Sequence, residues 1–429
     1  MTDSAVIVGA GVVGLATAHR LAQDGLAVTV VEAARGTAAS ASVHNAGWVV
    51  PIMSAPVPAP GMLGKAARWM IRRDSPLYVR PSPRPEHVRF MVNMLRRCNP
   101  RDFEYGVQAL VSLNARTLAL FDAYERDGVD FECHRTGQLM AFTTQQALDG
   151  YRADMASMER IGHTAEPLTG DELRDLEPAL GPQVHAGLRC PQERHLDPAG
   201  LVAGLEHRCR ELGVRFLRGR RVTDIRFRGT EASSVLAGGE EIPGTHFVLA
   251  AGVHTAALAR LAGFPLPIQP GKGYGFDDTS QAVELRHAVY LGEAKVAVTP
   301  LRDRLRFAGT MEFGSFGAAI DPRRLLGMAR SARTYLPGFP PSAPEQSWSG
   351  LRPMTPDGLP VVGPLPGTDN VLVASGHCML GVTLAPVTAD LIATAIGAGR
   401  HGADTSDIAL PFAPQRFAPR RRRAASTRT

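Results

Sequence analysis

Cysteine is scarce in this sequence. Five cysteines occur among 429 residues, and they are Cys98, Cys133, Cys190, Cys209 and Cys378. The number is odd, the spacing is wide, and there is neither a C-x-x-C pair nor a histidine cluster at the spacing of metal ligands. The pattern argues against a disulfide framework and predicts a protein of a reducing compartment without a metal site.

Most of the chain also lacks an excess of either positive or negative charge. The 47 Lys and Arg residues face 41 Asp and Glu residues, but six of the arginines and none of the acids lie in residues 411–429. The rest of the chain is therefore balanced, which argues against a nucleic-acid partner. We expect 411–429 to be a basic, disordered tail, and peripheral contact of this tail with the inner face of a membrane remains open.

Long uninterrupted apolar runs are absent. The first candidate, Ala5–Ala18, follows the acidic Asp3 where a signal peptide would be basic. The second, Val371–Ala389, is interrupted by Ser375, by glycines and by Pro386. Both stretches are better interpreted as a buried strand, a glycine turn and a helix, so we expect a cytoplasmic protein.

The N-terminus has the pattern of a nucleotide-binding unit. A β-branched strand leads into "GAGVVG", a helical stretch follows, and a second strand ends at Glu32. In such a unit Gly9 makes the tight turn, Gly11 lets the backbone approach a pyrophosphate, and Gly14 lets the helix pack on the sheet. Glu32 would accept ribose hydroxyls and repel a 2′-phosphate, which disfavours NADP. This unit alone does not decide between NAD and FAD.

Three further features favour FAD. Thr245–Thr255 reads as a buried strand ending in small residues, as expected where a second segment closes over the same cofactor. Asn370–Ala393 reads as a strand, a glycine turn and a helix whose N-terminus would direct a positive dipole at a reduced flavin. A second complete G-x-G-x-x-G with a following acid is absent, so electrons must come from the substrate.

Several motifs together resemble one known family. They are "GAGVVGLATAHRLAQDG", "SVHNAGWVVP", "RTGQLMAF", "PIQPGKGYGF" and "GLRPMTPDGLPVVGP" with the following "GHCMLGVTLAP". With these segments the chain resembles, over nearly its whole length, the D-amino-acid oxidase-like FAD-dependent oxidoreductases. The D-amino-acid dehydrogenase branch is the nearest, and glycine oxidase is a near relative.

The resemblance implies a mixed α/β fold of the D-amino-acid oxidase and glutathione reductase type. A Rossmann-like FAD-binding domain would be joined to an α+β substrate domain built on an antiparallel sheet. We expect residues 1–60, 190–265 and 345–410 in the FAD-binding domain, and residues 61–189 and 266–344 in the substrate domain.

The resemblance also implies two substrate-binding residues. Arg352 in "GLRP" would hold the substrate carboxylate, since its planar guanidinium matches a carboxylate bidentately. Tyr274 in "GKGYGF" would line the substrate pocket. The alternatives are an ordinary ion pair for Arg352 and a core position on a strand for Tyr274.

His44 departs from the branch, which usually has a small apolar residue before "NAG". In the related dimethylglycine and sarcosine dehydrogenases a histidine in a similar sequence is joined covalently to the flavin, so covalent attachment is one hypothesis, and a plain loop histidine is the favoured one. His377 is expected to be a structural neighbour of the flavin, and Cys378 a small residue in a glycine turn.

The full set of cofactor-binding residues implied by the motifs and the resemblance spans four parts of the chain. They are Gly9, Gly11, Val12, Val13, Gly14, Glu32, Ala33, Ser42, His44, Asn45, Ala46, Gly47, Val222, Ala251, Gly252, Gly376, His377, Leu380, Gly381, Val382 and Thr383.

The activity implied is oxidation of the Cα–N bond of a small amino acid. Hydride transfer to the flavin N5 would give an imino acid and then a 2-oxo acid, with D-amino acids such as D-proline or hydroxy-D-proline as substrates. Oxygen, a quinone or a carrier protein would accept the electrons. A glycine- or sarcosine-type oxidase, an NAD-dependent dehydrogenase and a non-catalytic flavoprotein binding through the Arg tail are the alternatives.

Overall fold

The computed structural model of the 429-residue chain describes residues 3–36, 40–61, 75–159, 164–317, 319–340, 346–401 and 409–418. Its strands are β1 (Ser4–Val8), β2 (Ala27–Glu32), β3 (Trp48–Val49), β4 (Leu77–Val79), β5 (Cys133–His134), β6 (Gln138–Phe142), β7 (Glu166–Thr169), β8 (Ala186–Cys190), β9 (Arg194–Leu196), β10 (Arg215–Arg218), β11 (Val222–Arg228), β12 (Glu231–Ala237), β13 (Glu240–Pro243), β14 (His246–Leu249), β15 (Gln269–Asp278), β16 (Ala288–Leu291), β17 (Val296–Leu301), β18 (Arg304–Phe313), β19 (Gln346–Met354), β20 (Val361–Pro364) and β21 (Val371–Ser375). Its helices are α1 (Val12–Gln23), α3 (Pro85–Arg96), α4 (Pro100–Asn114), α5 (Thr117–Arg126), α6 (Gln145–Glu159), α7 (Gly170–Leu176), α8 (Pro198–Glu211), α9 (Thr255–Leu261), α10 (Pro322–Tyr335) and α11 (Gly381–His401), with short 3₁₀ turns η1 (Pro51–Met53), η2 (Gly252–His254), η3 (Leu410–Phe412) and η4 (Pro414–Phe417).

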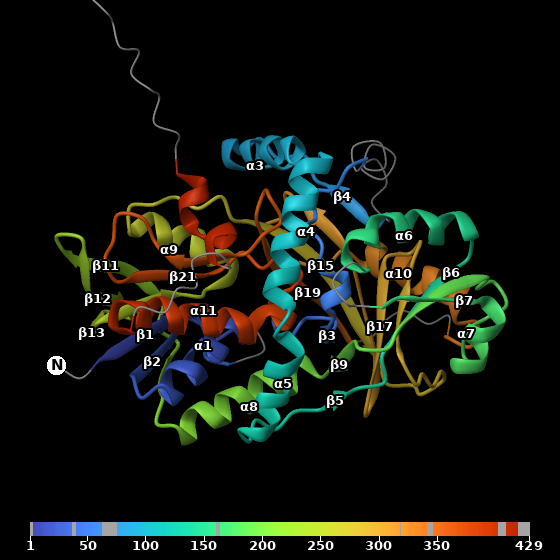
Figure 1. Cartoon of the computed structure of the whole chain (residues 1–429), viewed down its shortest axis with the longest axis horizontal. Coiled ribbons are helices and arrows are strands. Elements are labelled where there is room, and N and C mark those ends of the chain that lie inside the picture. The colour runs from blue at the N-terminus through green and yellow to red at the C-terminus, as the bar shows by residue number, and fades with distance from the viewer. Residues whose placement is uncertain are drawn as a thin grey trace, which may run out of the picture.

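The first layer is a six-stranded sheet in the order β10-β2-β1-β14-β21-β20, parallel except for β20 (Figure 1). Successive side chains of β1 point to opposite faces of the sheet and pack into two different hydrophobic cores. Ala5 and Ile7 pack with α1, α8 and α11, whereas Val6 and Val8 pack with the β11-β12-β13 meander and α9. Burial on both faces explains why β1 and β2 read as almost continuous apolar runs.

The second layer is a mixed sheet of nine strands in the order β19-β15-β18-β17-β16-β6-β8-β7, with β4 paired to β18. The sequence-based expectation of alternating antiparallel strands over 288–313 is confirmed, since β16 pairs with β17 and β17 with β18 in antiparallel register. Helix α10 packs on one face of this sheet, and η1, α4 and α6 contribute to the core beside β6 and β8. In Figure 1 the two large sheets lie on opposite sides of α4.

The strand that carries Arg352 corrects the predicted domain boundary at residue 345. Strand β19 pairs along its whole length with β15, from Gln269↔Met354 to Asp277↔Gln346. It therefore belongs to the nine-stranded sheet and not to the nucleotide-binding half. The chain re-enters the six-stranded sheet only at β20.

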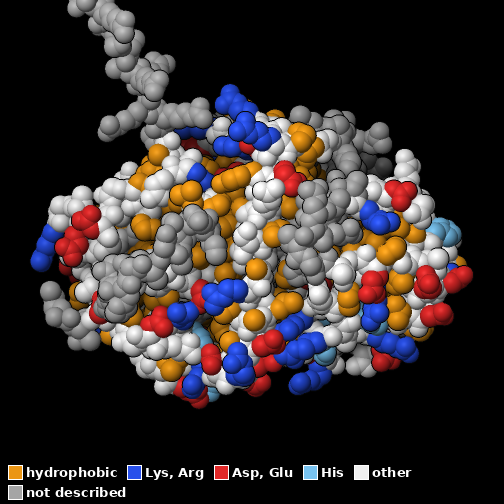
Figure 2. Space-filling view, viewed as in Figure 1, with side chains coloured by type: hydrophobic (Ala, Val, Ile, Leu, Met, Phe, Trp, Pro, Cys, Tyr) orange, Lys and Arg blue, Asp and Glu red, His pale blue; other side chains and the backbone are white. Residues whose placement is uncertain are grey.

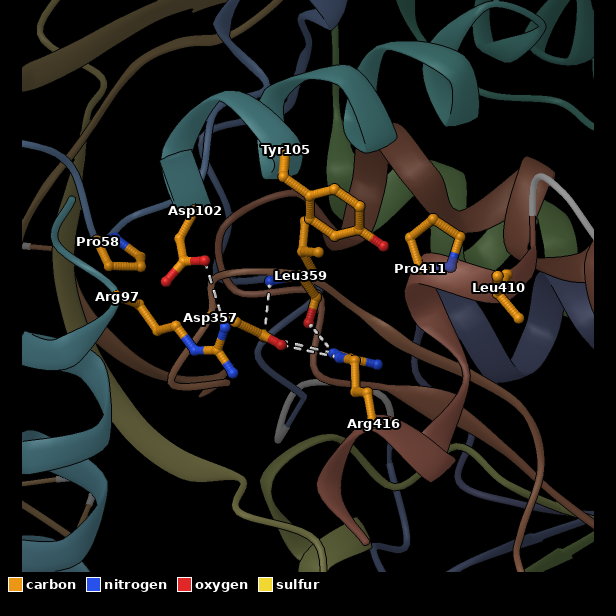
Figure 3. Close-up of a pocket in the computed structure, with 9 residues that line it drawn as sticks. All are labelled: Pro58, Arg97, Asp102, Tyr105, Asp357, Leu359, Leu410, Pro411 and Arg416. Carbon is orange, nitrogen blue, oxygen red and sulfur yellow. Dashed lines mark hydrogen bonds and ion pairs between the residues drawn. The ribbon is translucent and has the colours of Figure 1, made fainter. Parts of the chain in front are cut away.

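The predicted disordered tail is also corrected at its start. Phe412 is fully buried. Arg416 forms an ion pair with Asp357, with 2.8 Å between Nε and Oδ2, and donates to the carbonyl of Leu359 at 2.9 Å (Figure 3). These contacts tie residues 410–418 to the turn before β20, because a buried ring and a charged hydrogen-bonded pair offset the entropy of ordering them. The arginines at 420–423 lie outside the described residues.

The balanced charge of the chain has a structural counterpart on its surface. Figure 2 shows basic and acidic side chains interspersed along the lower edge, over α5 and α8. Arg194 and Asp122 approach to 2.6 Å there, and Arg208 and Glu211 to 2.8 Å. This edge of the molecule therefore carries both basic and acidic side chains and does not form a continuous basic surface. Among the residues described, no helix is long and apolar enough to cross a membrane.

Candidate active site

A cavity of about 930 Å³ lies between the two large sheets. It is lined at one end by the glycine turn after β1 and at the other by residues of β15, β17, β18 and β19. Its volume is near the upper end of the roughly 300–1,000 Å³ that small-molecule sites occupy. The cavity therefore suits a large cofactor that leaves room for a small substrate.

The glycine turn closes the first end of the cavity with backbone contacts that a larger residue would block. Gly9 has φ +116°, and a Cβ there would lie 2.5 Å from the carbonyl oxygen of Ala250. A Cβ on Gly14 would lie 2.0 Å from the carbonyl oxygen of Gly9. These two positions bring β1, α1 and β14 together, so that the N-terminus of α1 faces the cavity with the N–H groups of its first turn, as in a pyrophosphate site.

Glu32 is held at the end of β2. Its two carboxylate oxygens accept hydrogen bonds from the backbone N–H groups of Ala10 at 2.8 Å and Ala34 at 2.7 Å. Each oxygen keeps a further lone pair for a hydroxyl donor. The fixed negative charge suits ribose hydroxyls and repels a phosphate at the same place.

The segment from Ser42 to Gly47 crosses under the cavity. The Ser42 hydroxyl accepts from the backbone N–H of Val12 at 3.0 Å. The ring of His44 stacks on Trp348 of β19 with 5.4 Å between centroids and an interplanar angle of 10°. Burial, and to a lesser extent the charge of Arg306, lowers the pKa of His44. His44 is therefore a neutral imidazole at neutral pH.

The N-terminus of α11 faces the same space. Cys378, with φ +53°, turns the chain before the helix, and its N–H donates to the carbonyl of Pro353 at 3.0 Å. Leu380, Gly381, Val382 and Thr383 then line the cavity. The helix dipole is placed to stabilise negative charge on a group bound there.

His377 precedes this turn, and its side chain is hydrogen-bonded within the protein. It is 2% exposed, and its Nε2 lies 2.9 Å from the hydroxyl of Thr388 within α11. Burial lowers the pKa of His377 to about 3. A buried histidine with so low a pKa, whose Nε2 is hydrogen-bonded to the helix that follows it, is a structural neighbour of the turn and is too weakly basic to be a general base.

Arg352 is a half-buried cation at the far end of the cavity. Its guanidinium occupies the space that a side chain at position 273 would fill, since a Cβ on Gly273 would lie 2.3 Å from Cζ. It donates to the carbonyl of Thr310 at 2.8 Å, and no carboxylate of the described chain pairs with it. Burial and the nearby Arg324 lower its pKa to about 10, so it stays charged at neutral pH. A partly desolvated arginine without an acidic partner in the described chain offers a binding site for an anion from outside the chain.

A β-bulge shapes this anion site. Between β15 and β18 the register shifts, so that Thr310 and Met311 both lie opposite Gly273. Thr310 has φ +57°, which costs a β-branched residue about 1–3 kcal/mol. The strained residue aims its carbonyl at Arg352 and so fixes the guanidinium. Nothing in the local sequence marks this bulge in advance.

Tyr274 does not lie where the sequence analysis expected it. The side chains of β15 alternate, and Gly273 faces the cavity, so Tyr274 faces the opposite side of the sheet. It is 1% exposed and donates its hydroxyl to Glu312 at 2.5 Å. On the cavity side, the tyrosine that lines the space is Tyr290 of β16, which sequence reasoning missed.

The structure brings most of the predicted cofactor-binding residues to one cavity. Gly14, Gly47 and Gly376 do not line it. An added Cβ would meet a backbone carbonyl oxygen at Gly14 and at Gly47, and the side chain of Thr355 at Gly376. The residues that line it are Gly9, Gly11, Val12, Val13, Glu32, Ala33, Ser42, His44, Asn45, Ala46, Val222, Ala251, Gly252, His377, Leu380, Gly381, Val382 and Thr383, together with Arg352.

Lining residues that sequence reasoning did not find come mainly from the nine-stranded sheet. They include Ala297, Ala308, Thr310 and Phe313 as well as Trp348. Strands β17 and β18 are buried on both faces, so hydrophobic periodicity could not tell their cavity side from their core side. Elsewhere in the described chain, no group of three or more His, Cys, Asp or Glu residues is arranged to hold a metal ion.

The two-sheet fold, with a glycine turn, a carboxylate at the end of β2 and a helix N-terminus at one cavity, is the arrangement expected of a dinucleotide-dependent oxidoreductase. The model of the DAO family, described as FAD dependent oxidoreductase, matches residues 4–395, and the chain belongs to this family. FAD is therefore its cofactor, and the NAD alternative is set aside.

Curated and solved proteins agree with this assignment. A D-amino acid dehydrogenase of Rhizorhabdus wittichii is 33% identical over 413 residues, covering 94% of this chain and 99% of the relative. Glycine oxidase from Geobacillus kaustophilus superposes with a TM-score of 0.75 at 22% identity, covering 97% and 99% of the two chains. L-proline dehydrogenase from P. horikoshii superposes with a TM-score of 0.74 at 17% identity, covering 97% and 98%. At these identities the solved structures establish the fold alone.

Acid precipitation of the purified protein should leave the flavin in the supernatant. One face of the His44 ring is covered by Trp348, as expected for a histidine that serves as a packing residue under the cavity. The measurement is the flavin absorbance of pellet and supernatant. Flavin that stays in the pellet of the wild type, and is released in His44→Ala, would establish covalent attachment instead.

Proposed function

We propose that this protein oxidises the Cα–N bond of a D-amino acid to the imino acid, which hydrolyses to a 2-oxo acid. The observation that carries the proposal is Arg352, a half-buried guanidinium that opens into the FAD cavity and has no acidic partner in the described chain. A substrate carboxylate would supply the missing anion through two parallel hydrogen bonds. The 33% identity with a D-amino acid dehydrogenase supports the same substrate class.

The residues around Arg352 would hold and orient the substrate. The carbonyl of Thr310 fixes the guanidinium, and the absence of a side chain at Gly273 leaves room for it. When bound, FAD supplies the two-electron oxidant that takes hydride from Cα, which yields an imine that water converts to the 2-oxo acid and ammonia. Orientation against a fixed anchor provides the main catalytic contribution of the chain.

A protein base is not part of this proposal. Glu32 is the only carboxylate among the described residues that line the cavity, and it lies at the opposite end from Arg352. His377 is neutral and bonded to Thr388. The substrate amine would therefore react as its free base, with its proton released to water.

The electron acceptor separates two versions of the proposal. We favour a dehydrogenase that passes electrons to a quinone or a carrier protein, because the 33% identical relative is named a dehydrogenase. A glycine- or sarcosine-type oxidase would pass them to oxygen. Oxygen uptake with and without an artificial acceptor dye measures the difference.

The test is an anaerobic titration of the purified flavoprotein, followed by its visible spectrum. We expect D-amino acids to bleach the flavin absorbance, and matched L-amino acids to leave it unchanged. A yellow protein that none of the D-amino acids, prolines, glycine or N-methylglycines bleaches would overturn the proposed function. Bleaching by glycine and sarcosine alone would favour the oxidase-type alternative.

A further inference from the structure

The cavity beyond Arg352 is walled by apolar side chains from four separate segments. Val57 follows η1, Leu77 lies on β4, Met94 lies on α3, and Met311 and Phe313 lie on β18. Met94, Met311 and Phe313 are 3%, 7% and 1% exposed, and Val57 and Leu77 pack against them in one cluster. Residues distant in sequence thus converge on a single apolar wall.

This apolar wall begins at the carboxylate anchor. The Sδ of Met311 lies 3.7 Å from Nη1 of Arg352. Met311 is also one of the two bulge residues opposite Gly273. An amino acid whose carboxylate is held by Arg352 would therefore have the wall within reach of its side chain.

Charged groups lie elsewhere in the described cavity. Glu32 and the arginines of residues 218–221 lie at the nucleotide end, where β2 and β10 finish. Lys295 lines the cavity from the turn between β16 and β17, and its ammonium lies 5.3 Å from the ring centroid of Tyr151 and 5.6 Å from that of Tyr290. Tyr151 is on α6 outside the cavity and Tyr290 lines it, so the ammonium of Lys295 lies beside these two rings, on the β16 side of the cavity.

Methionine gives the wall a further property. Met94 and Met311 form part of it, and Met379 lines the cavity near the α11 turn. Methionine is unbranched and polarizable, and it adapts to ligands of different shape. A wall of this kind accommodates several apolar side chains and gives no compensation for burying a charge.

We propose that the preferred substrates are amino acids with large apolar side chains, such as leucine, methionine and phenylalanine, and not those with acidic or basic side chains. This inference rests on the proposed function and adds the class of side chain to it. The apolar wall selects by desolvation, because a charged side chain placed against it loses hydration without gaining a partner.

The experiment measures kcat/KM for D-leucine, D-methionine, D-phenylalanine, D-alanine, D-glutamate and D-lysine with an artificial electron-accepting dye. We expect D-leucine to exceed D-alanine by about 10- to 100-fold, as added methylenes in an apolar pocket typically do. We expect D-glutamate and D-lysine to fall below D-alanine. A preference for D-glutamate, D-lysine or D-alanine over all three large apolar substrates would overturn the inference.

Two variants test whether the apolar wall causes the preference. Leu77→Lys is expected to lower kcat/KM for D-leucine by about 10-fold or more and to raise the ratio of D-glutamate to D-leucine. Val92→Lys is the matched control, because Val92 lies on the outward face of α3 and is 41% exposed. Met94→Gln, nearly equal in size, is the second wall variant, and it should lower kcat/KM for D-leucine while the flavin content stays unchanged. Wall variants that keep their flavin and the wild-type substrate ranking would contradict the inference.

Failure of the inference is distinguishable from failure of the proposed function. If all the D-amino acids bleach the flavin and have similar values of kcat/KM, the proposed function holds and the proposed selection of apolar side chains is wrong. A flavin that no amino acid bleaches removes both.

Discussion

Arg352→Met is expected to lower kcat/KM for the amino-acid substrate by about 10²- to 10⁴-fold, while FAD stays bound. The physical reason is the loss of two charge-assisted hydrogen bonds, each contributing about 1.5–3 kcal/mol. The hydrogen bonds of its guanidinium go to the carbonyl oxygen of Thr310 and to the sulfur of Met311, both on β18 at the end of the cavity opposite the glycine turn. Steady-state kinetics and the flavin spectrum of the purified variant measure the two effects separately.

Two further variants sharpen this result. Arg352→Lys keeps the charge but loses the planar fork, so its loss of kcat/KM should fall between wild type and Arg352→Met. Arg323→Met removes an exposed arginine of α10 and should leave the kinetics unchanged. Wild-type kinetics in Arg352→Met would exclude the carboxylate-binding role and return the residue to an ordinary structural position.

Gly14→Ala should produce protein with little or no flavin. A Cβ at this position would lie 2.0 Å from the carbonyl oxygen of Gly9, a backbone atom that cannot move without displacing the glycine turn. Helix α1 must then shift away from β1, and its N-terminus leaves the position where it faces the phosphates. We expect FAD affinity to fall at least about 100-fold, equivalent to about 2.7 kcal/mol. The ratio of flavin to protein absorbance in the purified variant measures the loss.

Gly150→Ala is the matched control for this substitution. Gly150 lies within α6, is exposed, and has no atom within 4 Å of an added Cβ. It should retain the wild-type flavin content, with a small gain in stability from the better helix propensity of alanine. Full flavin content in Gly14→Ala would show that α1 packs less tightly on the glycine turn than the structure implies.

The nucleotide half of the fold could be predicted because its signals are local. Gly9, Gly11 and Gly14 lie within six residues of one another, and Glu32 follows one helix and one strand later. Each conformation there is required by contacts within the same short unit. The helix at α11 was predictable for the same reason, since a glycine turn separates it from an apolar strand.

The substrate half resisted prediction because its strands are buried on both faces. Tyr274 and Gly273 are adjacent, and the sequence offers no alternation of apolar and polar residues that would tell which of them faces the cavity. Which of the two residues faces the cavity depends on the pairing of β15 with β18 and β19, whose residues are far away in sequence. The bulge at Thr310 is likewise a property of the pairing and not of its own segment.

The sequence by itself determined the cofactor-binding unit and the mixed α/β class, whereas the candidate role of Arg352 came from the family resemblance. Short-range chemistry specifies the cofactor-binding unit, as its glycines and its carboxylate act through groups close to them in the chain. Only the tertiary structure decided that Tyr274 faces the core, that residues 410–418 are anchored by Arg416, and that four segments form an apolar wall beside Arg352. Strand register and packing between distant segments set these features, and neither is encoded in any single stretch of residues.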